Sequence, residues 1–174
     1  MISLEGFESR YNSELANELG NLVSRTVAMI VKYNESRVPA PVPGNADFSA
    51  EVRKLASDSA AALSTVDLTT CLERIWQFVR FLNKYVEDSA PWKLAKEEAS
   101  RQKLESVLYN LVEGLRIAAI MLHPFMPATT IEILRRLGQS SDSRFLMLDK
   151  AEWGSAATGV PVVSAEPLFP RLAS

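Results

Sequence analysis

An asparagine and an arginine, Asn21 and Arg25, stand one helical turn apart within the largely apolar segment LANELGNLVSRTVAMI (residues 15–30). Residues four apart share a face of a helix. A side-chain amide and a guanidinium placed in this way offer donors and an acceptor to one flat polar edge, which is the chemistry that reads a nucleic-acid base. The alternative is structural: Arg25 pairs with a carboxylate and Asn21 caps a loop. Taken alone, these two residues favour the structural interpretation.

Trp92 is the second group with binding chemistry. It follows Pro91 in the polar segment DSAPWKLAK (residues 88–96), with Lys93 and Lys96 close by. Unpaired bases stack on such rings with about 1–3 kcal/mol per base, and neighbouring lysines can contact phosphates. The alternative is that Trp92 fills a gap between helices.

No enzymatic site can be assembled from the sequence. Cys71 and His123 are the single cysteine and the single histidine, which excludes an intrachain disulfide and zinc sites with several Cys and His ligands. The seven glycines are scattered and form no phosphate-binding loop. We expect Cys71 to be a buried structural thiol and His123 to cap or pack at a helix end. Acidic pairs such as Glu97–Glu98 indicate solvated surface. We therefore predict no catalytic residue, metal or cofactor in this chain.

Charge and composition limit the partners. The net charge of −2 over 174 residues is unlike that of a nonspecific nucleic-acid binder, so RNA contact must come from a few placed groups. No run approaches the roughly 18 apolar residues of a membrane span. The segment MISLEGFESRYN carries acidic residues where a secretory signal is basic. With one cysteine, these features predict a cytoplasmic protein without a membrane partner.

Helical periodicity predicts three helices in the first half of the chain, and the first of them carries Asn21 and Arg25. A first helix is predicted over about 7–33, with Asn21 and Arg25 beside its apolar stripe. After a proline-rich loop at 34–46, Asp47 is a plausible N-cap for a second helix that runs to about Leu63. Asp67 caps a third helix, which we expect to be central in the bundle. The stripe of the first helix comprises Leu15, Leu19, Leu22, Thr26, Ile30 and Tyr33, and that of the third comprises Leu68, Leu72, Ile75, Val79, Leu82 and Val86.

In the second half, Pro91 disfavours helical geometry at Ala90 and suits the first position of a short helix. A long helix is predicted over about 100–122, and a last one over about 128–137 that stops at Gly138 as its C′ residue. Residues after about 154 show no period. The fold class is therefore all-α, a helix bundle over residues 1–150 with an extended C-terminal tail over 151–174.

Four segments together resemble the anticodon-binding domain of the methionyl-tRNA synthetase family. They are RYNSELANELGNLVSRT (10–26), VRFLNKYVEDSAPWKLAK (79–96), LRIAAIMLHPFMP (115–127) and PLFPRL (167–172). They occur in the family's order and span nearly the whole chain, with residues 34–66 the least distinctive part. LANELGNLVSR and APWKLAK are specific in combination, whereas the helical module itself is shared by other class I synthetases for aliphatic amino acids.

The resemblance implies that the helix bundle receives the anticodon loop of tRNA(Met). In that family the asparagine and the arginine of the matching stretch contact anticodon bases, and the tryptophan stacks on the first anticodon base. Carried onto this chain, these residues are Asn21, Arg25 and Trp92, with Pro91 supporting the turn.

The family's HIGH-like and KMSKS-like motifs for ATP are not found in the sequence. The resemblance therefore implies an excised C-terminal portion, whose partner is an N-terminal catalytic domain that this chain lacks. Methionine and ATP belong to that domain, and the fragment alone should be inactive. Without it, we expect residues after about 154 to be poorly anchored or held by other contacts.

Two alternatives remain open at this stage. The module could belong to a synthetase for isoleucine, valine or leucine, or it could be a helical protein-interaction domain without an RNA role. A buried Trp92 would support the second alternative. Three further basic residues are expected to be solvated surface rather than RNA contacts, namely Arg135, Arg136 and Lys150.

Overall fold

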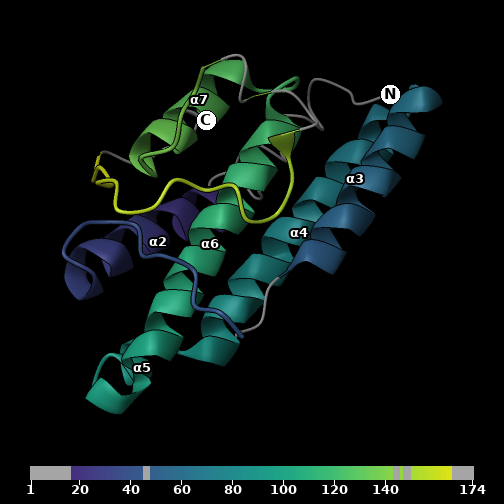
Figure 1. The fold of residues 1–174 in the computed structure, drawn as a ribbon. Coiled ribbons are helices and arrows are strands. Elements are labelled where there is room, and N and C mark those ends of the chain that lie inside the picture. Colours follow the sequence, from purple (N-terminus) through teal and green to yellow (C-terminus); the bar gives the residue numbers. More distant parts are fainter. Residues whose placement is uncertain (1–16, 45–47, 143–145, 147–149, 166–174) are drawn as a thin grey trace.

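The computed structural model describes residues 17–44, 48–142, 146 and 150–165, with only the backbone of Leu63. Figure 1 shows one bundle of helices crossed by an extended C-terminal segment. Among the described residues β-pairing is limited to an isolated bridge between Arg37 and Pro161, which confirms the all-α prediction. The helices are α2 (Gly20–Tyr33), α3 (Ser49–Ser64), α4 (Leu68–Ser89), α5 (Pro91–Leu94), α6 (Arg101–Leu122) and α7 (Pro127–Arg136), with a 3-10 turn η2 (Glu98–Ser100).

Helix α6 is the central element. Residues 106–122 are all buried, and α6 packs against α2, α4, α5 and α7 (Figure 1). The expectation that the third helix is central is therefore wrong. That helix, α4, keeps a polar face in solvent, and Leu68 in its predicted buried line is 46% exposed. From residue 106 onwards the sequence of α6 is mostly apolar, and its buried Glu113 and Arg116 pair with each other, as an enclosed helix requires.

The apolar stripe of α2 is confirmed where it is described. Leu19, Leu22, Thr26 and Ile30 are buried, and Tyr33 is half-buried. The helix itself begins at Gly20, after a π-helical turn at residues 17–19. The predicted start near residue 7 and the predicted N-cap Asp47 lie outside the described residues.

The break before Pro91 is also confirmed. Ala90 adopts the left-handed conformation (φ 46°, ψ 64°), which ends α4 and begins α5, and Pro91 stands at the start of α5. A residue with a Cβ rarely adopts this geometry, so the short helix leaves α4 at a strained and well-defined corner. At the other end of α4, the side chain of Asp67 accepts a hydrogen bond from the Thr70 amide at 3.1 Å, as expected of an N-cap.

Helix α7 ends in a Schellman motif. Gly138 (φ +70°) donates its amide to the Arg135 carbonyl at 3.1 Å, and the Gln139 amide donates to the Leu134 carbonyl at 2.8 Å. The predicted C′ role of Gly138 is confirmed. A Cβ on Gly138 would lie 2.4 Å from the Pro161 carbonyl oxygen, so a side chain at this position would collide with the C-terminal segment.

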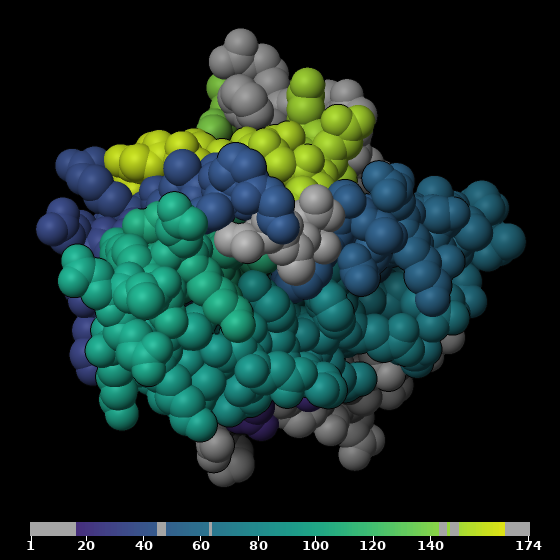
Figure 2. Space-filling view, turned by 60° about the horizontal axis from the view of Figure 1, so that its bottom comes forward, coloured from purple at the N-terminus to yellow at the C-terminus, as the bar shows by residue number. Residues whose placement is uncertain are grey.

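We call residues 150–165 the C-terminal strap. A fully buried carboxylate, that of Glu113, accepts hydrogen bonds from the amides of Gly154 (2.7 Å), Ser155 and Ala156 (3.0 Å). Further on, the Val38 amide donates to the Val160 carbonyl at 2.9 Å, and Figure 2 shows the strap lying along the segment that follows α2. The strap is thus held by contacts with the bundle rather than poorly anchored. Residues 166–174, including the segment PLFPRL, lie outside the described residues.

Candidate nucleic-acid interface

Asn21 and Arg25 lie on α2 beside its buried stripe, as predicted from the helical period. Asn21 is exposed, and its side chain makes no hydrogen bond to another described residue. Arg25 is half-buried, and its Nη2 donates to Glu87 Oε1 at 2.8 Å. Two further contacts hold this part of the chain along α4: Arg80 Nε pairs with Glu18 Oε2 at 3.1 Å, and Asn83 donates to the Glu18 carbonyl at 3.2 Å.

The structural alternative for Arg25 therefore holds in part, because the guanidinium has a carboxylate partner. The ion pair leaves most of its donors available, since Glu87 takes one hydrogen bond and a guanidinium has five N–H groups. The two side chains are 39% and 60% exposed. Ion pairs as exposed as this contribute about 0–1 kcal/mol, so exchanging Glu87 for an RNA group costs little.

Trp92 lies on α5 with its ring half-buried against the hydrophobic core, while Pro91 is buried. Trp92 thus packs against the core, as the gap-filling alternative expects, and remains partly accessible to solvent. The stacking of a base on this ring stays a prediction. Helix α5, which carries Trp92, is packed against α6 at one end of the bundle (Figure 1).

The corner at Ala90 relates the two parts of the candidate site. Glu87, the partner of Arg25, lies in the last turn of α4, and Trp92 follows it by five residues across that corner. Arg25 and Trp92 are thus carried by neighbouring elements. Among the described residues no hydrogen bond or ring contact joins Trp92 to Asn21 or Arg25, and their action as one base-binding surface stays a prediction.

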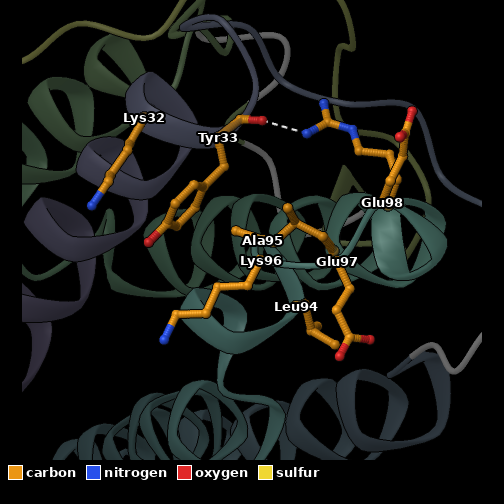
Figure 3. Close-up of a pocket in the computed structure, with 9 residues that line it drawn as sticks. Lys32, Tyr33, Leu94, Ala95, Lys96, Glu97 and Glu98 are labelled. Atoms are coloured by element: carbon orange, nitrogen blue, oxygen red, sulfur yellow. Dashed lines mark hydrogen bonds between the residues drawn. The ribbon is translucent and has the colours of Figure 1, made fainter.

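A hollow of about 440 Å³ adjoins α5, and the sequence patterns did not single it out as a site (Figure 3). The first residues of α6 form one side of it. There Arg101 donates through Nη1 to the Tyr33 carbonyl at 2.5 Å, the bond dashed in Figure 3, and through Nη2 to Asn34 Oδ1. The hollow is lined by Lys32, Tyr33, Leu94, Ala95, Lys96, Glu97, Glu98, Arg101 and Leu104. Its members are spread over some 70 positions of the chain, so only the folded bundle brings them together.

The residues set aside as structural behave as such. Cys71 is buried, and burial raises the pKa of its thiol, which keeps it protonated and unreactive. His123 Nδ1 lies 2.9 Å from Thr130 Oγ1, which ties the end of α6 to α7. Within the described ranges, no group of His, Cys, Asp and Glu could hold a metal ion. None of the helices described here is long and apolar enough to cross a membrane.

For one of the three basic residues predicted to lie at the solvated surface, the prediction is wrong. Arg136 is only 7% exposed, and its Nε donates to Glu132 Oε1 at 3.0 Å. It is buried because the C-terminal strap crosses this turn, where the Val163 amide donates to the Arg136 carbonyl at 2.8 Å. Arg135 and Lys150 are exposed, as expected.

Comparisons with known proteins, by sequence and by fold, both find tRNA ligases. The family model described as the anticodon-binding domain of tRNA ligase matches residues 45–160. The methionine–tRNA ligases of Lactococcus lactis and Enterococcus faecalis are 38% and 41% identical to this chain over 172 and 173 residues, which is 97% of the chain and 26% of each relative. The chain thus spans about a quarter of the length of these relatives.

Solved structures of Mycobacterium tuberculosis methionyl-tRNA synthetase share the fold. The free form gives a TM-score of 0.80 at 31% identity, covering 99% of this chain and 35% of that one. The complex with methionyl-adenylate gives 0.78 at 32% identity, covering 97% and 34%. The resemblance to this family, first drawn from four sequence segments, is confirmed. The chain belongs to the family of anticodon-binding domains of tRNA ligases.

Proposed function

We propose that this chain is the anticodon-binding part of a methionine–tRNA ligase and that its partner is the anticodon loop of tRNA(Met). The observation that carries the proposal is the placement of Trp92, partly exposed on a short helix that begins at a buried proline. The relatives described above are all ligases for methionine, which favours this function over a ligase for isoleucine, valine or leucine. Trp92 is not fully buried, so it does not give the support that a buried ring would give to a protein-interaction module without RNA.

The geometry accounts for recognition in two steps. The strained corner at Ala90 and the buried ring of Pro91 orient Trp92 before RNA arrives, so that little ordering entropy is lost when a base stacks on it. Asn21 and Arg25 then approach base edges from α2, whose buried stripe fixes their separation. Stacking and bidentate edge contacts are each worth about 1–3 kcal/mol. Together they discriminate among anticodons without a basic protein surface.

The remaining parts of the function belong to the longer protein that the proposal implies. An N-terminal catalytic domain would bind methionine and ATP, form methionyl-adenylate and transfer methionine to the tRNA in the cytoplasm. The present chain would supply the anticodon contacts that commit the correct tRNA to that domain. By itself it would hold no cofactor and would catalyse no reaction.

Binding of short RNA hairpins tests the proposal directly. We expect the chain to bind a stem-loop with the methionine anticodon more tightly than the same stem-loop with an isoleucine or valine anticodon. Asn21→Ala, Arg25→Ala and Trp92→Ala should each weaken binding about 5- to 150-fold, the equivalent of 1–3 kcal/mol. Lys54→Ala, on the exposed face of α3, is the matched control and should bind like the parent chain. Equal affinity for all three anticodons would contradict the proposed function.

A further inference from the structure

The hollow beside α5 separates charge in a way that suits an anion. In Figure 3 the ammonium groups of Lys32 and Lys96 extend to the side of the Tyr33 ring that carries its hydroxyl, whereas the carboxylates of Glu97 and Glu98 extend to the opposite side. One side of the hollow is thus cationic although the chain as a whole carries a net charge of −2.

The two lysines are available for a ligand. Neither Lys32 nor Lys96 forms an ion pair or a hydrogen bond with another described residue, and both are exposed. Lys32 Nζ lies 5.5 Å from the centroid of the Tyr33 ring, a cation–π contact that keeps the ammonium beside this ring. Two free ammonium groups and one hydroxyl donor therefore border the same hollow.

Arg101, the third cation of the hollow, has a different role. Its guanidinium is engaged by the Tyr33 carbonyl, Asn34 Oδ1 and Glu105 Oε1, the last at 3.0 Å. The first two of these bonds hold the C-terminal turn of α2 against the start of α6 and so fix the backbone that carries Lys32 and Tyr33. The Arg101 side chain therefore stabilises the wall of the hollow, and the two lysines remain the cations that can contact a ligand.

The position and size of the hollow, with its two lysines, point to a class of ligand. Leu94, which lines the hollow, follows Trp92 by two residues on the same short helix. The volume of the hollow, about 440 Å³, lies in the range of small-ligand sites, about 300–1,000 Å³. We propose that it binds the sugar–phosphate backbone next to the nucleotide stacked on Trp92, with Lys32 and Lys96 contacting one phosphodiester and the Tyr33 hydroxyl donating a hydrogen bond to it. This inference rests on the proposed anticodon-binding function and adds a backbone subsite to it.

A salt series on the full chain tests the subsite. Dissociation constants for the methionine stem-loop and for one mismatched stem-loop would be measured between 50 and 300 mM KCl for Lys32→Gln, Lys96→Gln and the control Lys54→Gln. A lysine that meets a single-stranded phosphate contributes about 0.7 to the slope of log affinity against log salt. Because both lysines are proposed to face one phosphodiester, we expect each of the first two variants to lose part of that slope, and to lose it equally with either anticodon, since phosphate contacts carry no base information.

A neutral linkage locates the phosphate. Single methylphosphonates would be placed in turn along the anticodon loop. At one position we expect the substitution to weaken binding by the parent chain but to leave the affinity of Lys32→Gln unchanged from that for the unmodified RNA. Tyr33→Phe should weaken binding about 2- to 10-fold without changing the salt slope, since a hydroxyl releases no counterion. Salt slopes of Lys32→Gln and Lys96→Gln equal to that of Lys54→Gln would overturn the subsite while anticodon preference in the parent chain preserved the proposed function. Loss of anticodon preference in the parent chain would overturn both.

Discussion

Arg25 on α2 donates a hydrogen bond to Glu87 on α4 at 2.8 Å, although 62 residues separate them in the chain. The guanidinium predicted to read a base therefore already has an anionic partner in the free domain. RNA and Glu87 compete for the same positive charge, and a carboxylate beside an approaching anticodon also repels its phosphates. The resting ion pair should thus weaken nonspecific encounters more than cognate ones.

Glu87→Gln tests this competition. The amide keeps an acceptor for Arg25 and removes the negative charge, so we expect the methionine stem-loop to bind up to about fivefold more tightly, in line with the 0–1 kcal/mol of an exposed pair. The gain should be larger for mismatched stem-loops, which lowers discrimination. Fluorescence anisotropy with both RNAs measures the two effects. A tenfold loss of cognate affinity would instead show that the charge of Glu87 orients Arg25 for base contact.

Tryptophan fluorescence distinguishes the stacking ring from the other two. Trp76 is buried, and Trp153 packs edge-on against Phe48 and Tyr109, with ring centroids 5.4 and 6.5 Å away. We predict that the methionine stem-loop quenches emission and that Trp92→Phe abolishes this quenching while Trp153→Phe preserves it. Trp92→Phe should also bind more tightly than Trp92→Ala, because a phenyl ring still offers a stacking face. Quenching that survives in Trp92→Phe would place the stacked base elsewhere.

The local features of the fold could be predicted because their causes are local. The stripe of α2, the corner before Pro91 and the end of α7 at Gly138 each follow from residue types within a few positions. The same reasoning misjudged the centre of the bundle. It placed the third helix, α4, at the centre instead of α6, because amphipathic periods do not reveal what other segments cover the remaining faces of a helix.

In the candidate site, too, some residues could be predicted from local sequence and others could not. Trp92 could be singled out because proline precedes it and lysines surround it. The Arg25–Glu87 pair, the contact of Arg101 with the end of α2 and the burial of Arg136 all depend on segments more than 20 residues away. No periodicity or spacing encodes such pairings. Residue types and spacing therefore do not reveal the hollow next to α5, although they indicate Lys96 as a potential phosphate contact.

The acid stability of α7 should depend on Glu132. The hydrogen bond from Arg135, with that from Arg136, lowers the pKa of Glu132 from 4.5 to about 2. A carboxyl group whose pKa is depressed on folding stabilises the native state above pH 4.5 and loses that contribution as the pH falls towards 2. Because the side chain is 32% exposed, we expect a contribution of about 1 kcal/mol after screening.

Urea unfolding of the parent chain and Glu132→Gln between pH 2 and pH 6 measures this contribution. The parent should be the more stable by about 1 kcal/mol at pH 6, and the two free energies of unfolding should converge near pH 2. High salt should reduce the difference at pH 6, since the ion pairs are partly exposed. A difference independent of pH would mean that packing, rather than the charge of Glu132, stabilises this turn.

Glu113 should be the anchor of the C-terminal strap. Its buried carboxylate pairs with Arg116 and accepts the amides of residues 154–156, while Arg116 donates to the carbonyls of Lys150 (3.0 Å) and Glu152 (2.8 Å). Glu113→Gln leaves a buried guanidinium without its counterion, which costs about 3–5 kcal/mol. We expect a correspondingly lower free energy of unfolding and faster hydrogen exchange at Gly154, Ser155 and Ala156. Asp88→Asn, which breaks the exposed Lys84–Asp88 pair, should leave both measurements unchanged.

A double replacement separates the two roles of this carboxylate. Glu113→Leu with Arg116→Met removes both charges together, and apolar side chains of similar volume often restore or exceed the stability of a buried ion pair. We therefore expect the free energy of unfolding to recover most of what Glu113→Gln loses. The amides of residues 154–156 should nevertheless exchange quickly, because their acceptor is gone and backbone N–H groups must then find water. Slow exchange in the double variant would show that the strap is held by the packing of Trp153 and by its pairing with residues 36–38, and that Glu113 serves only to neutralise Arg116.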